Sequence, residues 1–333
     1  MNQFLYRMAQ TKIFWPIVAL FVLLLLNFLL IPGFFSIEIK DGHLFGSLID
    51  IFNRVMPLLI ISIGMTLVIA KGGIDISVGS ILAISGALAA YIMENSSIWI
   101  ALIAAVGVGV ICGMWNGILV SIFEIQPMVA TLILLTVGRG IAQLITGGQI
   151  LTIDDEIYKY IGSGFLFGLP FPIFIGGAIF LIILYMKKRT AMGLFLESIG
   201  NNITASKFAG IQPRKIIFLV YTISGLCAAI AGVIVSANVS SADANNAGLW
   251  IELDAILAVV IGGTSMRGGR YFLGGTVVGA LFIQTLSTTI YSVGINPQIV
   301  MVVKAFVVIM VCLFQSEQFR GLFMQFNKKK VSI

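Results

Sequence analysis

The feature that most limits the fold of this chain is an apolar run without a charged side chain, from Ile13 to Ile31. Its length is close to the ~20 residues that cross a bilayer as a helix. Only 10% of the 333 residues are charged, against roughly 25% in a soluble domain, so the chain cannot cover a folded core with a water-facing surface. The run is longer than the apolar region of a signal peptide, and no small-residue cleavage site follows it. We therefore expect an integral membrane protein whose first span is retained.

Apolar runs of similar kind recur along the whole sequence, and glycine is abundant among them, as in bundles whose helices approach closely. They predict an all-α fold, a polytopic membrane helix bundle of about ten spans that forms a single domain over residues 1–333. The eighth run is too short to cross a bilayer alone, which predicts a broken or half-depth helix. The predicted spans are 13–31, 55–70, 76–93, 98–122, 128–147, 170–186, 216–236, 254–265, 272–292 and 298–315.

Lysine and arginine are distributed unevenly between the segments that join these spans. With the N-terminus inside, the outer segments contain only Lys40, Arg54 and Lys159. This asymmetry predicts a multi-pass protein of the inner (plasma) membrane with both termini in the cytoplasm. It also explains the net charge of +6 without nucleic acid as a partner. The cations assigned to the cytoplasmic side are Arg7, Lys12, Lys71, Lys187, Lys188, Arg189, Lys207, Arg214, Lys215, Arg267, Arg270, Arg320, Lys328, Lys329 and Lys330.

Two apolar runs are interrupted in a similar way. Leu67–Ser80 contains a Gly-Gly pair followed by Asp75 and Ser77, and Val259–Gly269 loosely repeats the glycine pair and the polar break. A Gly-Gly pair permits backbone that a helix cannot hold. The two polar residues then cap the following helix or line a cavity at membrane depth, and these interpretations are compatible. Paired interruptions in two halves of a membrane protein point to a transport site.

Arg139 lies within the predicted fifth span, four residues before Gln143 and on the same helix face. A charge at this depth is costly in lipid, so we expect both side chains to face the bundle interior. In the interior, these side chains either lie near a transport pathway or form an internal pair with an acid. Lys304, in the last predicted span, can instead extend its ammonium group outward to the membrane surface.

The segment Ser240–Asp254 is polar and contains no cation, and the predicted orientation places it outside. Its amides, carboxylates and tryptophan are groups that bind sugars through hydrogen bonds and ring stacking. The alternative is an ordinary outer loop with Trp250 in the aromatic belt at the membrane surface. The candidate pathway residues of this segment are Asp243, Asn245, Asn246 and Glu252.

The longest predicted cytoplasmic segment, Lys187–Lys215, has basic residues at both ends and helix-compatible stretches between them. It fits an amphipathic helix that binds a protein partner, with a helix lying on the lipid surface as the alternative. The sequence contains no phosphate-binding G-x-x-x-x-G-K-[ST] loop, so we do not expect an enzyme that hydrolyses ATP by itself. The single histidine, His43, belongs to no metal-binding pattern, and the sequence indicates no cofactor.

Several short motifs follow one another in a fixed order along the sequence: Gly72–Ser80 (GGIDISVGS), Gly117–Val120, Pro127–Leu132, Ile199–Asn202, Ala209–Ile211, Glu252–Ile256 and Ile261–Gly263. Together they resemble the permeases of ribose-type monosaccharide ABC importers, and the resemblance covers nearly the whole chain. Three longer runs, Asp41–Arg54, Thr131–Ile150 and Ala242–Gly263, resemble the permeases of galactofuranose importers in particular.

The resemblance implies a permease subunit that works with a cytoplasmic ABC ATPase, a second permease (the same or a paralogous chain) and an outer sugar-binding protein. It also implies that Lys187–Lys215 contains a coupling helix for the ATPase, with Glu197, Gly200, Asn201 and Gly210 as candidates. An ion-coupled secondary sugar transporter is the alternative function, although no acid lies deep in a predicted span. A membrane anchor without transport leaves the broken helices and Arg139 unexplained.

Overall fold

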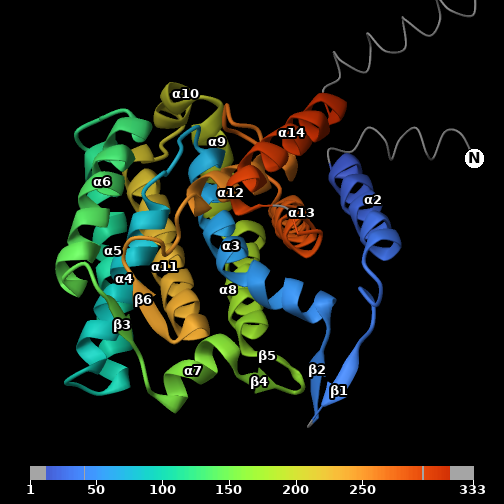
Figure 1. Cartoon of the computed structure of the whole chain (residues 1–333). Coiled ribbons are helices and arrows are strands. Elements are labelled where there is room, and N and C mark those ends of the chain that lie inside the picture. Colours follow the sequence, from blue (N-terminus) through green and yellow to red (C-terminus); the bar gives the residue numbers. More distant parts are fainter. Residues whose placement is uncertain (1–12, 41, 295, 316–333) are drawn as a thin grey trace, which may run out of the picture.

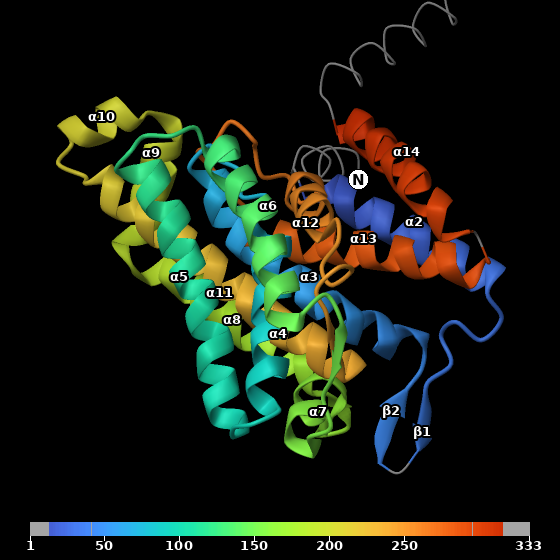
Figure 2. The same ribbon diagram turned by 60° about the vertical axis from the view of Figure 1, so that its left-hand side comes forward.

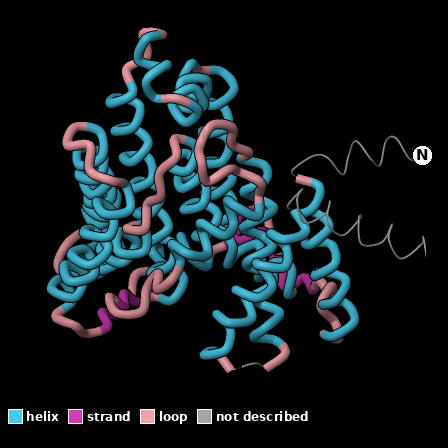
Figure 3. Tube along the Cα trace, turned by 90° about the horizontal axis from the view of Figure 1, so that it is seen from above, coloured by secondary structure: helices cyan, strands magenta, loops and turns pink. Residues whose placement is uncertain are grey.

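The computed structural model describes residues 13–40, 42–294 and 296–315, and most of them are helical (Figure 1, Figure 3). Three short two-stranded antiparallel sheets pair β1 with β2, β3 with β6 and β4 with β5. The elements are α2 (Phe14–Leu30), β1 (Glu38–Lys40), β2 (His43–Phe45), α3 (Ser47–Ala70), α4 (Val78–Met93), α5 (Ile98–Ser121), α6 (Pro127–Thr146), β3 (Ile150–Thr152), α7 (Glu156–Ser163), β4 (Phe165–Leu166), β5 (Leu169–Pro170), α8 (Phe171–Arg189), α9 (Ala191–Asn201), α10 (Ile203–Phe208), α11 (Pro213–Val239), β6 (Ser241–Asp243), α12 (Ile251–Ile261), α13 (Leu273–Ser292) and α14 (Pro297–Gln315).

The all-α prediction is confirmed, whereas the number of spans remains a prediction. Six helices of the described chain are long and apolar enough to cross a membrane: α3, α5, α6, α8, α11 and α13. Shorter apolar helices lie at α2, at α4 and within α14. Each of the ten predicted ranges therefore contains a helix. The predicted half-depth eighth span is α12, whose 11 residues rise only about 16 Å.

Two predicted boundaries were wrong by several residues. The second span was placed from residue 55, but α3 begins at Ser47, because Asp50 in its first turn suits a helix N-terminus and Pro57 does not end the helix. The eighth span was placed at 254–265, but α12 covers Ile251–Ile261 and ends at the glycine pair that follows. The cations predicted at the two chain ends, Arg7, Lys12, Arg320 and Lys328–Lys330, lie outside the described residues.

The bundle has two distinct ends. The short helices α9 and α10 lie at one end, which we call the α9 end (Figure 1). The β1–β2 hairpin and α7 lie at the opposite end, the hairpin end, in both views (Figure 1, Figure 2). In the β1–β2 hairpin Glu38 pairs with Phe45, and the nearby β4–β5 hairpin joins it through a bond from the Leu44 N–H to the Gly168 carbonyl (3.0 Å).

The helices α3 and α11 form the centre of the bundle. In the most apolar part of α3, 83% of the residues are buried, against 17% in α8, so α3 is enclosed by other helices and α8 is peripheral. An enclosed helix is apolar on all sides, and α3 shows this from Leu58 to Ala70, broken only by small residues such as Ser62 and Thr66. The α11 helix packs against α3, α4 and α5.

Glycine allows α5 and α11 to approach backbone to backbone. A methyl group at Gly113 of α5 would overlap the backbone of Tyr221 and Thr222, and one at Gly225 of α11 would overlap the backbone of Gly109 and Gly113. Small residues at helix contacts are the usual means of close packing in membranes, where apolar side chains gain nothing by leaving lipid.

We expect Gly113→Val to lower the stability of the bundle by about 1–3 kcal/mol, because the added side chain forces α5 and α11 apart. The matched control is Gly107→Val on the same helix, because Gly107 has open space around it. Thermal unfolding of the purified protein in detergent measures both. Equal melting temperatures for the two variants would show that the close α5–α11 contact is absent.

Candidate functional site

The interruption between α3 and α4 is organised by a buried carboxylate. Asp75 and Ser77 have no exposed surface. One Asp75 oxygen accepts hydrogen bonds from the Ser77 N–H (3.1 Å) and the Ser77 hydroxyl (2.6 Å), and the other accepts one from the Ser224 hydroxyl of α11 (2.8 Å). Asp75 therefore binds the N–H of Ser77, the residue before α4, and not the N–H groups of the first helical turn that a capping side chain binds. Ser77 itself forms no cap with its side chain.

The same segment is tied to two further helices. Asn116 of α5, also fully buried, donates from its amide to the Ser77 hydroxyl (2.8 Å). The Ile76 N–H donates to the Thr131 hydroxyl of α6 (3.3 Å). We call Asp75, Ser77, Asn116 and Ser224 the Asp75 cluster. It joins the start of α4 to α5 and α11 in the interior of the bundle.

Lys71 ends α3 and extends over the ring of Tyr221, with its ammonium nitrogen 4.7 Å from the ring centroid. Tyr221 is buried and belongs to the same turn of α11 as Ser224. A cation over an aromatic face is stabilised by the ring quadrupole. The interruption is thus held on α11 by the hydrogen bond between Asp75 and Ser224 and by the cation–π contact between Lys71 and Tyr221.

The second interruption, between α12 and α13, lies directly against the first. The Gly269 N–H donates to the Ala70 carbonyl at the end of α3 (2.8 Å), and Gly72 lies beside the Arg267 carbonyl. The Thr66 and Thr276 hydroxyls, on the helices that flank the two interruptions, are 2.7 Å apart. The two sequence segments that resemble each other therefore meet at the α9 end.

The predicted coupling residues contact these interruptions. Gly200 of α9 packs on the Ala70 carbonyl and the Gly269 N–H so closely that any side chain would overlap them, and the side chain of Asn201 lies beside Gly269. Glu197 forms an ion pair with Lys187 (3.6 Å). These three residues make internal contacts, which the sequence interpretation did not anticipate because it assigned the segment to a partner.

The remaining candidate, Gly210, follows α10 with a positive φ of 81° and open space around it. The apolar side chains that α9 and α10 expose are Leu194, Ile203 and Phe208, the last with 89% of its surface exposed. These side chains, rather than Gly200, form the exposed surface of the segment.

Arg139 and Gln143 of α6 do share a face, and both bind the chain that leads into α12. One Arg139 nitrogen donates to the carbonyls of Ala244 (3.2 Å) and Ala247 (2.6 Å), and the Gln143 amide donates to the side chain of Asn245 (2.8 Å). Arg139 is half-buried, as expected, but it binds backbone carbonyls rather than an acid. Gln143 is exposed on the single chain, which contradicts the prediction that it faces the bundle interior.

Residues Ala244–Trp250 turn back from β6 into the bundle, and we call them the re-entrant segment. Asp243 begins it by accepting bonds from the N–H groups of Asn245 (2.9 Å) and Asn246 (3.1 Å) and from the Asn246 amide (2.7 Å), which turns the chain. Further along, Gly248 and Glu252 pack against Gly79, the second residue of α4. The segment thus passes from β6 deep into the bundle.

This course overturns the interpretation of Ser240–Asp254 as an ordinary outer loop. Gly248 and Glu252, on either side of Trp250, lie at the level where α4 begins, far from the hairpin end. Glu252 is 7% exposed, and its Oε2 atom has no hydrogen-bond partner. Lys304 of α14 binds Asp254 of α12 (2.8 Å) instead of extending outward to the membrane surface.

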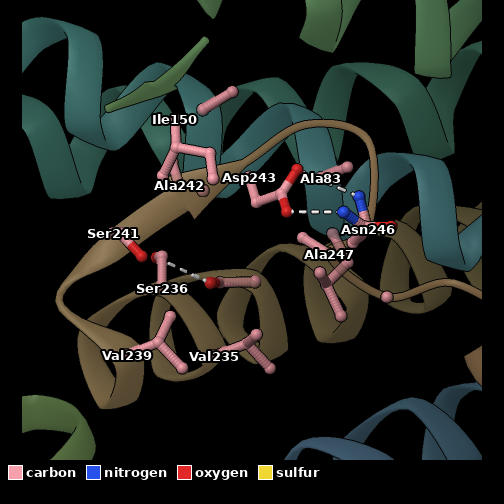
Figure 4. A pocket seen from close by; sticks show the side chains of 15 residues that line it. Ala83, Ile150, Val235, Ser236, Val239, Ser241, Ala242, Asp243, Asn246 and Ala247 are labelled. Atoms are coloured by element: carbon pink, nitrogen blue, oxygen red, sulfur yellow. Dashed lines mark hydrogen bonds between the residues drawn. The ribbon is translucent and has the colours of Figure 1, made fainter. Parts of the chain in front are cut away.

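A cavity of about 340 Å³ lies between α4, α11, β6 and the re-entrant segment (Figure 4). Small side chains keep it open, and Asp243 and Asn246, bonded to each other, lie along one side (Figure 4). Ser236, on another side, bonds to the hydroxyl of Tyr158 (2.7 Å). The lining residues are Leu82, Ala83, Gly86, Ala87, Ile150, Gly232, Val235, Ser236, Val239, Ser241, Ala242, Asp243, Asn246, Ala247 and Gly248.

Comparison with known proteins shows which family the chain belongs to. The family model for the permease component of branched-chain amino acid transport systems matches residues 47–312. The chain belongs to this permease family. It is 52% identical over 314 residues to the galactofuranose transporter permease protein YtfT of Escherichia coli (strain K12), with 92% of each chain covered. No solved structure matches it.

Two further relatives of the permease carry related names. The fructose import permease protein FruF of Bifidobacterium longum (strain NCC 2705) is 37% identical over 99% of this chain and 94% of its own. The ribose import permease protein RbsC of Escherichia coli (strain K12) is 36% identical over 91% and 93%. The resemblance drawn from the sequence motifs is therefore confirmed.

The sequence interpretation missed the partners of Asp75 in this permease. Asn116 and Ser224 are isolated polar residues inside apolar runs. That isolation is a usable signal, because a polar side chain in a membrane helix needs a hydrogen-bond partner. What the sequence does not show is which of several such residues share one cluster, because they are up to 149 positions apart in the chain.

We expect Asp75→Ala to destabilise the permease by at least about 1–3 kcal/mol, because it leaves the Ser77 N–H and two hydroxyls without their acceptor. Asp75→Asn retains one carbonyl oxygen, and its effect should be clearly smaller. Asp154→Ala is the control, because that carboxylate is exposed at the hairpin end. Thermal unfolding in detergent gives the comparison, and equal melting temperatures for Asp75→Ala and Asp154→Ala would contradict a structural role for the Asp75 cluster.

Proposed function

We propose that this permease is the membrane-spanning subunit of an ABC importer for a monosaccharide, galactofuranose or a related sugar. The observation that carries the proposal is the 52% identity to a galactofuranose transporter permease over 92% of both chains. The fructose and ribose import permeases, at 37% and 36% identity, support the monosaccharide class. ATP hydrolysis then belongs to a separate cytoplasmic ATPase, and delivery of the sugar belongs to an outer sugar-binding protein.

The α9 end is proposed to face the cytoplasm. Most cations of the described chain lie at this end, in the last turn of α8, in α10, at the start of α11 and around the second interruption. Lys40, Arg54 and Lys159 lie toward the other end. Cytoplasmic loops carry such an excess of lysine and arginine. In Figure 1, α2 begins and α14 ends toward the α9 end, which supports the proposal that both termini are cytoplasmic.

The sugar pathway is proposed to run along the face of α6 that carries Thr136, Arg139 and Gln143, with the re-entrant segment beside it. Thr136, Gln143 and Asn245 are exposed on the single chain. Polar groups in a spanning helix are costly against lipid, so this face needs water or a second permease, of the same or a paralogous chain, to cover it. Asp243, Asn246 and Glu252 belong to the walls of this pathway, and Asp75 and Ser77 support the helix beneath it.

The ATPase is proposed to dock on α9 and α10. Leu194, Ile203 and Phe208 expose apolar surface there, which fits a protein contact. Glu197, Gly200, Asn201 and Gly210 shape the segment that presents this surface. Because Gly200 packs on Ala70 and Gly269, a displacement of α9 by the ATPase reaches the end of α3 and the second interruption directly.

Uptake by proteoliposomes tests the function. Vesicles with the permease, its ATPase and its sugar-binding protein should accumulate radiolabelled D-galactose, which includes the furanose form in solution, only when ATP is supplied at the ATPase side. An ion gradient without ATP should drive no uptake. Accumulation driven by the gradient alone would instead support an ion-coupled carrier.

We expect Phe208→Asp to weaken docking of the ATPase, because the charged side chain disrupts an apolar contact centred on a large aromatic residue, which is typically worth about 2 kcal/mol or more. Uptake and permease-stimulated ATP hydrolysis should fall together by about tenfold or more. Phe208→Leu keeps the apolar surface and should retain most activity. Normal stimulation of the ATPase by Phe208→Asp would contradict docking at this surface.

We expect Arg139→Met to lower uptake by about tenfold or more, because two hydrogen bonds from a charged donor, each worth about 1.5–3 kcal/mol, no longer hold the re-entrant segment. Gln143→Met loses a single exposed bond and should have the smaller effect. Initial rates of sugar uptake, normalised to the amount of permease in the membrane, provide the measurement. Equal rates for the parent and Arg139→Met would exclude a pathway role for this side chain.

A further inference from the structure

The last turn of α8 carries three consecutive cations, and only the first is used inside the protein. Lys187 forms an ion pair with Glu197 (3.6 Å), and its ammonium nitrogen lies 3.7 Å from the centroid of the Tyr271 ring. Lys188 and Arg189 are exposed, and neither has an ion-pair or hydrogen-bond partner within the described residues. Their charges are therefore available to a partner outside the chain.

The side chains that precede these two cations on α8 are apolar and exposed. Leu181 is 62% exposed, Ile182 58% and Tyr185 65%. Residues three, four, seven or eight positions apart share one face of a helix, so these side chains lie in line with Lys188 and Arg189. Of the six helices long enough to cross a membrane, α8 is the least buried, so other helices of the chain leave this face uncovered.

The five side chains of this face line an open groove of about 540 Å³. From Leu181 to Arg189 the groove extends over roughly 12 Å, at about 1.5 Å per residue. Along it, apolar side chains are followed by Tyr185 and then by the two cations. A membrane surface has its layers in the same order, because acyl chains give way to the interface that tyrosine prefers and then to the phosphates.

We propose that this groove binds an anionic phospholipid, with an acyl chain along Leu181 and Ile182 and the headgroup phosphate against Lys188 and Arg189. Basic residues beside the ends of membrane helices bind anionic headgroups. A free phosphate would leave the apolar part of the groove unused. The ATPase fits less well, because the groove extends along an apolar, membrane-length helix and a cytoplasmic protein remains in water. The site adds a lipid ligand to the permease and does not depend on which sugar is carried.

Native mass spectrometry of the permease in detergent tests the site, with phosphatidylglycerol and phosphatidylcholine of identical acyl chains added in equal amounts. The parent should retain phosphatidylglycerol preferentially. The double variant Lys188→Gln/Arg189→Gln should lower this preference by about tenfold or more, because it removes both cations from the phosphate. The matched control is Lys207→Gln/Lys215→Gln, which removes the same charge from exposed positions of α10 and α11, outside the groove, and should keep the preference of the parent.

Equal retention of the two lipids by the parent would overturn the proposal, and so would an equal loss in both double variants, which would indicate unspecific attraction of charge. Displacement of phosphatidylglycerol by an equal concentration of inorganic phosphate would assign the cations to a free anion instead. Loss of ATPase binding by Lys188→Gln/Arg189→Gln with an unchanged lipid preference would assign them to the protein partner.

Both positions are exposed, so the double variant should fold, and its melting temperature in detergent checks this. If it does not fold, the single variants Lys188→Gln and Arg189→Gln decide, because each should lower the preference by a smaller factor, and a parent-like preference in both would reject the site. Sugar uptake is not the readout, so a failure of the proposed sugar transport leaves the result on lipid binding unchanged.

Discussion

The architecture depends on how one carboxylate is accommodated inside an apolar bundle. Asp75 has no exposed surface, and an ion removed from water loses several kcal/mol of solvation that only close partners restore. Its partners are the next turn of the chain and a hydroxyl of α11, while α5 reaches the same cluster through Asn116. Three helices must therefore be in their final positions before the polar groups of the interruption at the start of α4 have all their hydrogen-bond partners.

Backbone of the second interruption finds its hydrogen-bond partner at the first. The end of α3 offers the Ala70 carbonyl, and the chain between α12 and α13 supplies the Gly269 N–H that binds it. Backbone released from helices at membrane depth must be enclosed by protein or face a water-filled space. Here the two released stretches enclose each other, and α9 closes over them at Gly200. This mutual contact gives a structural reason for the similarity of two sequence segments nearly 200 residues apart.

Much of this fold could be predicted from the sequence, because lipid leaves a spanning chain few choices. The apolar runs predicted the helices, the glycine pairs predicted the interruptions, and the eighth run, placed at 254–265, was recognised as too short to cross. The depth of Ser240–Asp254 could not be predicted in the same way. Its polar composition suits both a surface loop and a re-entrant segment, and the difference is made by Arg139, which binds its carbonyls from a distant helix. Similarly, composition does not distinguish a glycine that contacts a partner from Gly200, which is enclosed.

The ion pair between Lys304 and Asp254 has a consequence for how the chain enters the membrane. Asp254 is synthesised 50 residues before its partner, which corresponds to roughly 3–10 s of translation. During that interval the start of α12 carries acidic groups that lipid does not tolerate without compensation. Asp254 therefore gains this ionic partner only after α14 has been synthesised, so the last described helix completes an element made well before it.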